Sequence, residues 1–264
     1  MSRIDSKFQE LRAAKKKAFI AYVTAGFPDM GSTEKLVLAL EKAGVDIIEL
    51  GLPFSDPMAD GSVIQLASFR SLEAGTTPKK VLDCVRRLRE VTDIPIALMG
   101  YYNPVHHWGD AAFAAAAKEA GVDGLIIPDL PVEEAADLRA AAKRHDLSLV
   151  FFLAPTTAPA RVAGIVRAAT GFVYFVSVAG VTGARQVMPS NIMRQVKQAR
   201  ALGRTPVCVG FGVSTPEQVK ALAAFADGVI VGSAIIKEID KHSGKEDMPE
   251  RVAAFVKELS SQIR

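Results

Sequence analysis

The sequence contains little of what marks several classes of protein. Its two cysteines, Cys84 and Cys208, lie far apart with no paired spacing, so nothing indicates a disulfide framework or a zinc site. No apolar run approaches the roughly 20 residues of a membrane span. Residues 1–17 contain no apolar stretch that could act as a signal peptide. We therefore expect a cytoplasmic protein that does not contact a membrane.

Charge and motif content exclude further classes. The formal net charge of +3 is too small to indicate a nucleic acid as partner. The one tight basic run, Lys15-Lys16-Lys17, is predicted to be a solvated helix end. The sequence has no H-E-x-x-H or similar ligand spacing, so we expect no metal site. It also lacks the G-x-S-x-G elbow that would present a serine nucleophile.

What is present is a repeat of short apolar runs separated by helical patterns. The runs are almost continuously apolar, which is typical of parallel strands buried on both faces. Strands are expected at Phe19–Thr24, Asp46–Leu50, Ile96–Gly100, Gly124–Pro128, Leu149–Leu153, Phe172–Ser177, Val207–Gly210 and Gly228–Val231. Helices are expected at Glu34–Ala43, Val63–Glu73, Pro78–Val91, Ala111–Ala120, Glu133–His145, Pro159–Ala169, Asn191–Leu202 and Pro216–Phe225. Ser32 or Thr33 is expected to cap the first of these helices, and Thr77 and Thr215 two later ones.

The repeat predicts the fold class. Eight units in 264 residues give 33 residues per unit, a length that suits one strand, one helix and their loops. An open doubly wound sheet is the alternative, but no G-x-G-x-x-G follows the first strand. We therefore predict a single-domain (β/α)8 TIM barrel over residues 1–264, with an N-terminal helix and a short extra helix after the eighth strand.

Glycine-containing loops follow the last three predicted strands. Val209–Val213 follows the seventh and Val231–Ile236 the eighth, where barrels of this kind commonly bind phosphate. The second segment can open a short helix whose free N–H groups would face an anion. Gly180–Gly183, after the sixth strand, suits a loop that closes over a substrate. The alternative for the first two segments is that their glycines only form tight turns, and the alternative for Gly180–Gly183 is a plain surface loop.

Two carboxylates in different surroundings indicate acid–base chemistry. Glu49 lies within an apolar strand, so burial should raise its pKa and allow it to exchange a proton near neutral pH. Asp60 lies on a loop rich in proline and glycine, and is expected to stay wetter and ionised. Asp56, on the same loop, is a competing candidate that spacing alone does not exclude. The predicted strands contain no lysine for a Schiff base.

These segments resemble one family, the alpha subunit of tryptophan synthase. Its most specific segment is Glu49–Gly61, and Met99–Pro104, Pro128–Pro131 and Gly180–Gly183 agree in order and spacing. The resemblance covers nearly the whole chain. It implies a retro-aldol cleavage of indole-3-glycerol phosphate to indole and glyceraldehyde 3-phosphate.

The resemblance also implies roles for individual residues. Glu49 would be the acid–base glutamate and Asp60 the catalytic aspartate, which Thr182 of the closing loop would meet. Residues implied to contact the substrate are Tyr22, Tyr174, Thr182, Gly183, Phe211, Gly212, Gly232 and Ser233. Tyr22 stands where the family often has phenylalanine, and Ser62 stands where it commonly has proline.

A partner is implied as well. The family's alpha subunit needs a beta subunit, with which we expect an alpha2-beta2 heterotetramer. Pro53, Asp56, Asn103 and Pro104 would lie at that interface. No cofactor is expected in this chain, because pyridoxal phosphate would belong to the beta partner.

Three alternatives are weighed against this interpretation. A sugar-phosphate epimerase would carry metal-binding histidines on its strands, and an indole-glycerol-phosphate-forming synthase would use strand lysines. The predicted strands contain neither. The third alternative is an inactive barrel that only binds phosphate ligands, which the presence of both Glu49 and Asp60 disfavours.

Overall fold

Eight parallel strands close into a barrel in chain order. The computed structural model describes residues 1–176, 190–210 and 212–263. The strands are β1 (Ala18–Thr24), β2 (Ile47–Gly51), β3 (Ile96–Met99), β4 (Gly124–Ile126), β5 (Ser148–Leu153), β6 (Val173–Val176), β7 (Val207–Gly210) and β8 (Gly228–Val231). The eight predicted strands are confirmed, β7 and β8 with identical bounds and the others with ends that differ by at most two residues among those described, so the predicted fold class is correct.

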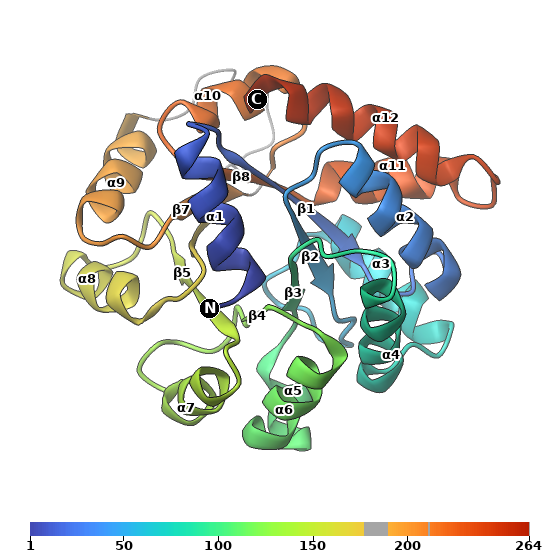
Figure 1. Ribbon diagram of the computed structural model, residues 1–264, viewed down its shortest axis with the longest axis horizontal. Coiled ribbons are helices and arrows are strands. Elements are labelled where there is room, and N and C mark those ends of the chain that lie inside the picture. Colours follow the sequence, from blue (N-terminus) through green and yellow to red (C-terminus); the bar gives the residue numbers. More distant parts are fainter. Residues whose placement is uncertain (177–189, 211, 264) are drawn as a thin grey trace.

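Helices surround the barrel (Figure 1). They are α1 (Arg3–Ala13), α2 (Met30–Lys42), α3 (Ser62–Glu73), α4 (Pro78–Arg89), α5 (Tyr102–Trp108), α6 (Asp110–Ala120), α7 (Ala136–Arg144), α8 (Pro159–Ala168), α9 (Ser190–Ala201), α10 (Pro216–Ala223), α11 (Ser233–His242) and α12 (Met248–Ser260), with a 3-10 turn at Ser261–Ile263. No helix in these described ranges is long and apolar enough to cross a membrane.

The predicted helices were wrong at the start of α2, and they missed α5 and α12. Helix α2 begins at Met30 because Asp29 is its cap and accepts a hydrogen bond from the Ser32 amide at 2.8 Å. Residues 102–108, which lie outside the predicted helices, form helix α5. The proline at position 104 is compatible with this helix because it lies in the first turn, where no intrahelical N–H bond is lost. The Thr77 and Thr215 caps are confirmed.

Helix α1 closes the amino-terminal end of the barrel (Figure 1). Its apolar face forms one buried cluster with side chains that point into the barrel. This cluster contains Ile4, Phe8, Leu11, Ala18, Ile20, Ile47, Ala97, Ile126, Val150, Phe172, Cys208 and Ile230. A separate, larger cluster lies between the strands and the outer helices. Because this cluster fills the amino-terminal half of the barrel interior, a ligand can enter the barrel only from the carboxyl ends of the strands.

A buried ion pair holds α4 against the start of β3. Arg89 donates from Nη2 to Asp123 at 2.7 Å, and from other nitrogens to three backbone carbonyls. The Asp123 carboxylate also accepts from the Ile96 amide at 2.9 Å, and its side chain is only 3% exposed. The pair therefore fixes the amino-terminal edge of the barrel, opposite the end where the predicted site residues lie.

Candidate active site

The alternation of the strands brings Tyr22, Glu49 and Tyr174 into the barrel. Tyr22 and Glu49 are partners in the register of β1 and β2. Each lies two residues beyond a side chain of the buried interior cluster, Ile20 and Ile47 respectively, and so points to the same side of its strand. Tyr174 follows Phe172 in the same way on β6. The three side chains thus form a layer on the carboxyl-terminal side of the buried cluster that contains Ile20, Ile47 and Phe172.

Glu49 is buried, and one of its carboxyl oxygens lacks a hydrogen-bond partner within the described residues. It is 1% exposed, and within the described part of the chain no hydrogen-bond partner reaches its Oε2. Burial, with a smaller contribution from the charge of Asp60, raises the pKa of Glu49 to about 8. The group is therefore mostly protonated near neutral pH and can either donate or accept a proton. A buried oxygen without a partner is costly, and a substrate atom could satisfy it.

Asp60 lies on the loop between β2 and α3 and is held by Tyr101. The Tyr101 hydroxyl donates to Asp60 Oδ2 at 3.0 Å and accepts from the Ala59 amide at 2.8 Å. The Tyr101 ring stacks on Phe54 with centroids 5.3 Å apart. Sequence reasoning missed Tyr101, although its position two residues after the end of β3 places it at the carboxyl end of the barrel.

Asp60 is less exposed to water than predicted, although it is still the first of the two carboxyl groups to ionise. The sequence predicted a wetter, ordinary carboxylate, but burial raises the pKa of Asp60 to about 6, although the Tyr101 hydrogen bond lowers it in part. Asp60 still ionises well before Glu49, so the two carboxyl groups have different protonation states near pH 7.

The structure separates the two candidate aspartates of this loop. Asp56 is exposed and accepts a hydrogen bond from the neighbouring Ser55 hydroxyl at 2.6 Å. Asp60 is close enough to Glu49 for its charge to raise the pKa of that group. Asp60, and not Asp56, therefore shares a site with Glu49.

Glycines make room for the two tyrosines. A Cβ at Gly51 would lie 2.3 Å from the Tyr22 hydroxyl oxygen, and one at Gly210 would lie 2.8 Å from that of Tyr174. Tyr22 accepts a hydrogen bond from the Thr24 hydroxyl at 3.2 Å. The Tyr22 hydroxyl, which a phenylalanine would lack, is therefore turned toward β1 and β2. Tyr22 is buried and Tyr174 is half-buried, and loss of contact with water raises the pKa of both phenols well above the ordinary value. They remain neutral at any pH at which the protein would work.

The predicted anion loop after β8 opens helix α11. Gly232 is the residue before the helix, Ser233 is its first residue, and the Gly232 carbonyl accepts from the Ile236 amide at 3.1 Å. The first N–H groups of a helix have no acceptor within it and favour an anion. Gly212, after β7, has a φ of +72°, a conformation that favours glycine. Thr182, Gly183 and Phe211 lie outside the described residues.

The predicted interface residues lie at the same end of the barrel. Pro53 and Asp56 follow β2, whereas Asn103 and Pro104 lie in α5 after β3. Asp56 and Asn103 are exposed, Pro104 is half-buried and Pro53 is buried. Their exposure is therefore mixed, and they remain predictions. In the ranges that the structure covers, no group of three or more His, Cys, Asp or Glu side chains could hold a metal ion.

Comparison with known proteins identifies close relatives over the whole chain. Residues 8–264 match a family model described as "Tryptophan synthase alpha chain". The tryptophan synthase alpha chain of Citrifermentans bemidjiense is 49% identical over 263 residues, covering 100% of this chain and 98% of the relative. That of Geobacter sulfurreducens is 50% identical over 263 residues, covering 100% and 99%.

Solved structures of similar chains have the same fold over the whole length of this chain. Tryptophan synthase subunit alpha from Legionella pneumophila str. Paris superposes with a TM-score of 0.92 at 40% identity, covering 100% of this chain and 98% of that one. A chain of tryptophan synthase from M. tuberculosis, in an open form, superposes with a TM-score of 0.90 at 35% identity, covering 100% and 99%.

Proposed function

The chain belongs to the tryptophan synthase alpha chain family, and from this premise we propose that it is a carbon–carbon lyase that cleaves indole-3-glycerol phosphate to indole and glyceraldehyde 3-phosphate. The observation that supports the proposal best is the buried Glu49, whose Oε2 has no partner in the described structure and whose pKa is raised to about 8. A carboxyl group in that state suits proton transfer to carbon.

The proposed reaction begins with a proton from Glu49. Protonation of indole C3 places positive charge on the ring nitrogen, which the ionised Asp60 stabilises from the ring N–H side. The bond from C3 to the glycerol chain then breaks and its electrons return to the ring. The hydroxyl on the released carbon loses its proton and becomes the aldehyde. Glu49, now ionised, takes up that proton, so the site returns to its starting state.

The rest of the site positions the substrate. Tyr22 and Tyr174 give the indole a buried aromatic surface, and Gly232 and Ser233, with Gly183, Phe211 and Gly212, hold the phosphate. Anchoring the phosphate fixes the scissile bond relative to Glu49. No cofactor bound to this chain takes part.

A beta subunit completes the proposed enzyme. We expect an alpha2-beta2 heterotetramer in the cytoplasm, with Pro53, Asp56, Asn103 and Pro104 at the contact and pyridoxal phosphate in the beta subunit. The similarity to solved structures named tryptophan synthase supports a partner of this kind.

The experiment is a direct assay of the purified chain with indole-3-glycerol phosphate, followed by detection of indole with and without a beta subunit. We expect indole in both cases, and about 10²–10⁴-fold slower release of indole from a Glu49→Gln variant under the same conditions. A wild-type chain that binds the substrate without releasing indole would instead support an inactive phosphate-binding barrel.

Ser233→Ala tests the phosphate cradle separately. Loss of one donor to a charged group should weaken binding of a glycerol phosphate by about 10-fold or more. Binding of indole, which has no phosphate, should not change. Equal losses for both ligands would place the phosphate elsewhere.

A further inference from the structure

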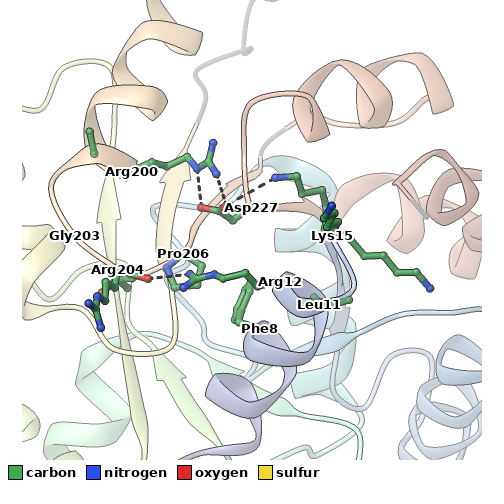
Figure 2. A pocket seen from close by; sticks show the side chains of 13 residues that line it. Phe8, Leu11, Arg12, Lys15, Arg200, Gly203, Arg204, Pro206 and Asp227 are labelled. Carbon is green, nitrogen blue, oxygen red and sulfur yellow. Dashed lines mark hydrogen bonds and ion pairs between the residues drawn. The ribbon is translucent and has the colours of Figure 1, made fainter.

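A pocket lies at the opposite end of the barrel from Glu49. It has a volume of about 670 Å³ and lies between the end of α1, the loops that precede β7 and β8, and the end of α9. Figure 2 shows Arg200 and Asp227 on one side of this pocket and Arg12 and Arg204 on another. The proposed reaction does not use it.

Positive charge is concentrated in this amino-terminal pocket. Its lining contains six cationic side chains and one carboxylate, that of Asp227. The cationic residues are Arg12, Lys15, Lys16, Lys17, Arg200 and Arg204. The pocket therefore carries five excess positive charges, whereas the whole chain has a formal net charge of +3. The rest of the molecule is thus slightly negative, and an anion would be drawn toward this end.

The walls of the pocket are fixed by contacts between distant segments. Arg200 binds Asp227 through two nitrogens at 2.7 and 2.9 Å, and Asp227 also accepts from the Val207 amide at 3.0 Å. Arg12 Nη2 donates to the Arg204 carbonyl at 3.2 Å, which ties α1 to the loop before β7 (Figure 2). Because these contacts already order the backbone, little of it would have to be ordered by a ligand.

Other cationic groups of the pocket are not neutralised. Within the described residues, the guanidinium of Arg204 and the ammonium of Lys15 have no carboxylate within ion-pair distance, and both side chains are exposed. Lys15 also has a φ of +56°, in the left-handed region that favours glycine at the end of a helix. A lysine at this position thus adds a charge at the rim of the pocket at the expense of backbone strain.

We propose that this pocket binds a small molecule with a diphosphate or triphosphate group. Guanidinium groups match the geometry of phosphate oxygens and stay charged at every physiological pH. The volume lies within the range of small-ligand pockets, roughly 300–1,000 Å³, and leaves space for an organic portion beside the buried edges of Phe8 and Leu11. A bound anion would add a further link between α1 and the loop before β7, which the Arg12 hydrogen bond already connects.

The alternative is that these cations only stabilise helix ends. Helices α1 and α9 both end at the pocket, and cations near a helix C-terminus offset its negative partial charge. Lys15→Gly separates the two explanations. It removes one charge and relieves the backbone strain, so it should leave the melting temperature unchanged or raise it while weakening ligand binding.

The test is calorimetric titration of the full chain with pyrophosphate, tripolyphosphate and ATP, at low and at moderate salt. We expect tripolyphosphate or ATP to bind one site with a submillimolar Kd, and Lys15→Gly and Arg204→Ala each to weaken it by about 10-fold. Arg144→Ala is the matched control, since Arg144 is an exposed cation in the last turn of another helix, α7. The Arg144→Ala variant should bind tripolyphosphate or ATP with the same affinity as the wild type.

Hydrogen–deuterium exchange locates the bound anion. Protection should appear in residues 12–17 and 203–207, and saturating glycerol 3-phosphate should not abolish it. Protection confined to residues 232–236, or complete competition by glycerol 3-phosphate, would place the anion in the cradle at α11 and overturn the proposal. Unchanged affinity in Arg204→Ala, or tighter binding of a DNA duplex than of ATP, would overturn it as well.

Discussion

The buried carboxyl group of Glu49 should make the stability of the protein depend on pH in a way that Glu49→Gln removes. In the folded chain the pKa is raised from 4.5 to about 8, with burial as the main cause. Between these two values the folded state binds more protons at this group than the unfolded state does. Stability therefore falls as the pH rises through this range, and above about pH 8 the loss is complete.

The magnitude follows from the width of the pH interval. From pH 6 to about pH 8, Glu49 is protonated in the folded chain and ionised in the unfolded chain. Over these roughly two pH units the free energy of unfolding falls by about 3 kcal/mol, and from there to pH 9 it changes little further. Glutamine has a similar shape and no ionisable proton, so the variant should not lose this amount. The free energy of unfolding of the wild type should thus fall by about 3 kcal/mol more than that of Glu49→Gln over the same interval.

Urea denaturation at pH 6, 7, 8 and 9 measures this difference, with circular dichroism as the probe. Asp56→Asn is the control, because Asp56 is exposed and its removal should leave the pH dependence unchanged. In the same preparations, Glu49→Gln should lower turnover of indole-3-glycerol phosphate by about 10²–10⁴-fold. Parallel pH dependences for the wild type and Glu49→Gln would refute the argument that Glu49 is desolvated in the folded chain.

Three further predictions concern Asp60, Tyr101 and Arg89. Asp60→Asn should reduce turnover by about 10²-fold or more, while Asp56→Asn, assayed without a beta subunit, should not; the reverse result would reassign the catalytic aspartate. Tyr101→Phe removes the hydrogen bond that lowers the pKa of Asp60, so the acidic limb of the pH–rate profile should move to higher pH; an unmoved limb would contradict this. Arg89→Met leaves Asp123 buried without its closest cationic partner and should cost about 3–5 kcal/mol in urea unfolding; a loss below about 1 kcal/mol would contradict that reasoning.

Local patterns in the sequence were enough to predict the eight strands, most of the helices and the strand that bears Glu49, the proposed acid–base residue. Parallel strands that are buried on both faces must be continuously apolar, so a single carboxylate among Ile47, Ile48 and Leu50 was visible as an exception. Threonine before proline marked the starts of α4 and α10 correctly because that cap depends only on local hydrogen bonds.

Features that depend on contacts between distant segments could be read only from the folded chain. Asp56 and Asp60 look alike in the sequence, and they differ because the Tyr101 hydroxyl, 41 positions along the chain, lies 3.0 Å from Asp60. The same holds for the raised pKa of Asp60, since burial is a property of the closed barrel. The basic run at Lys15 showed only an exposed helix end until folding brought Arg200 and Arg204 to the same pocket. Charges add in space, and no spacing in the sequence encodes their distance.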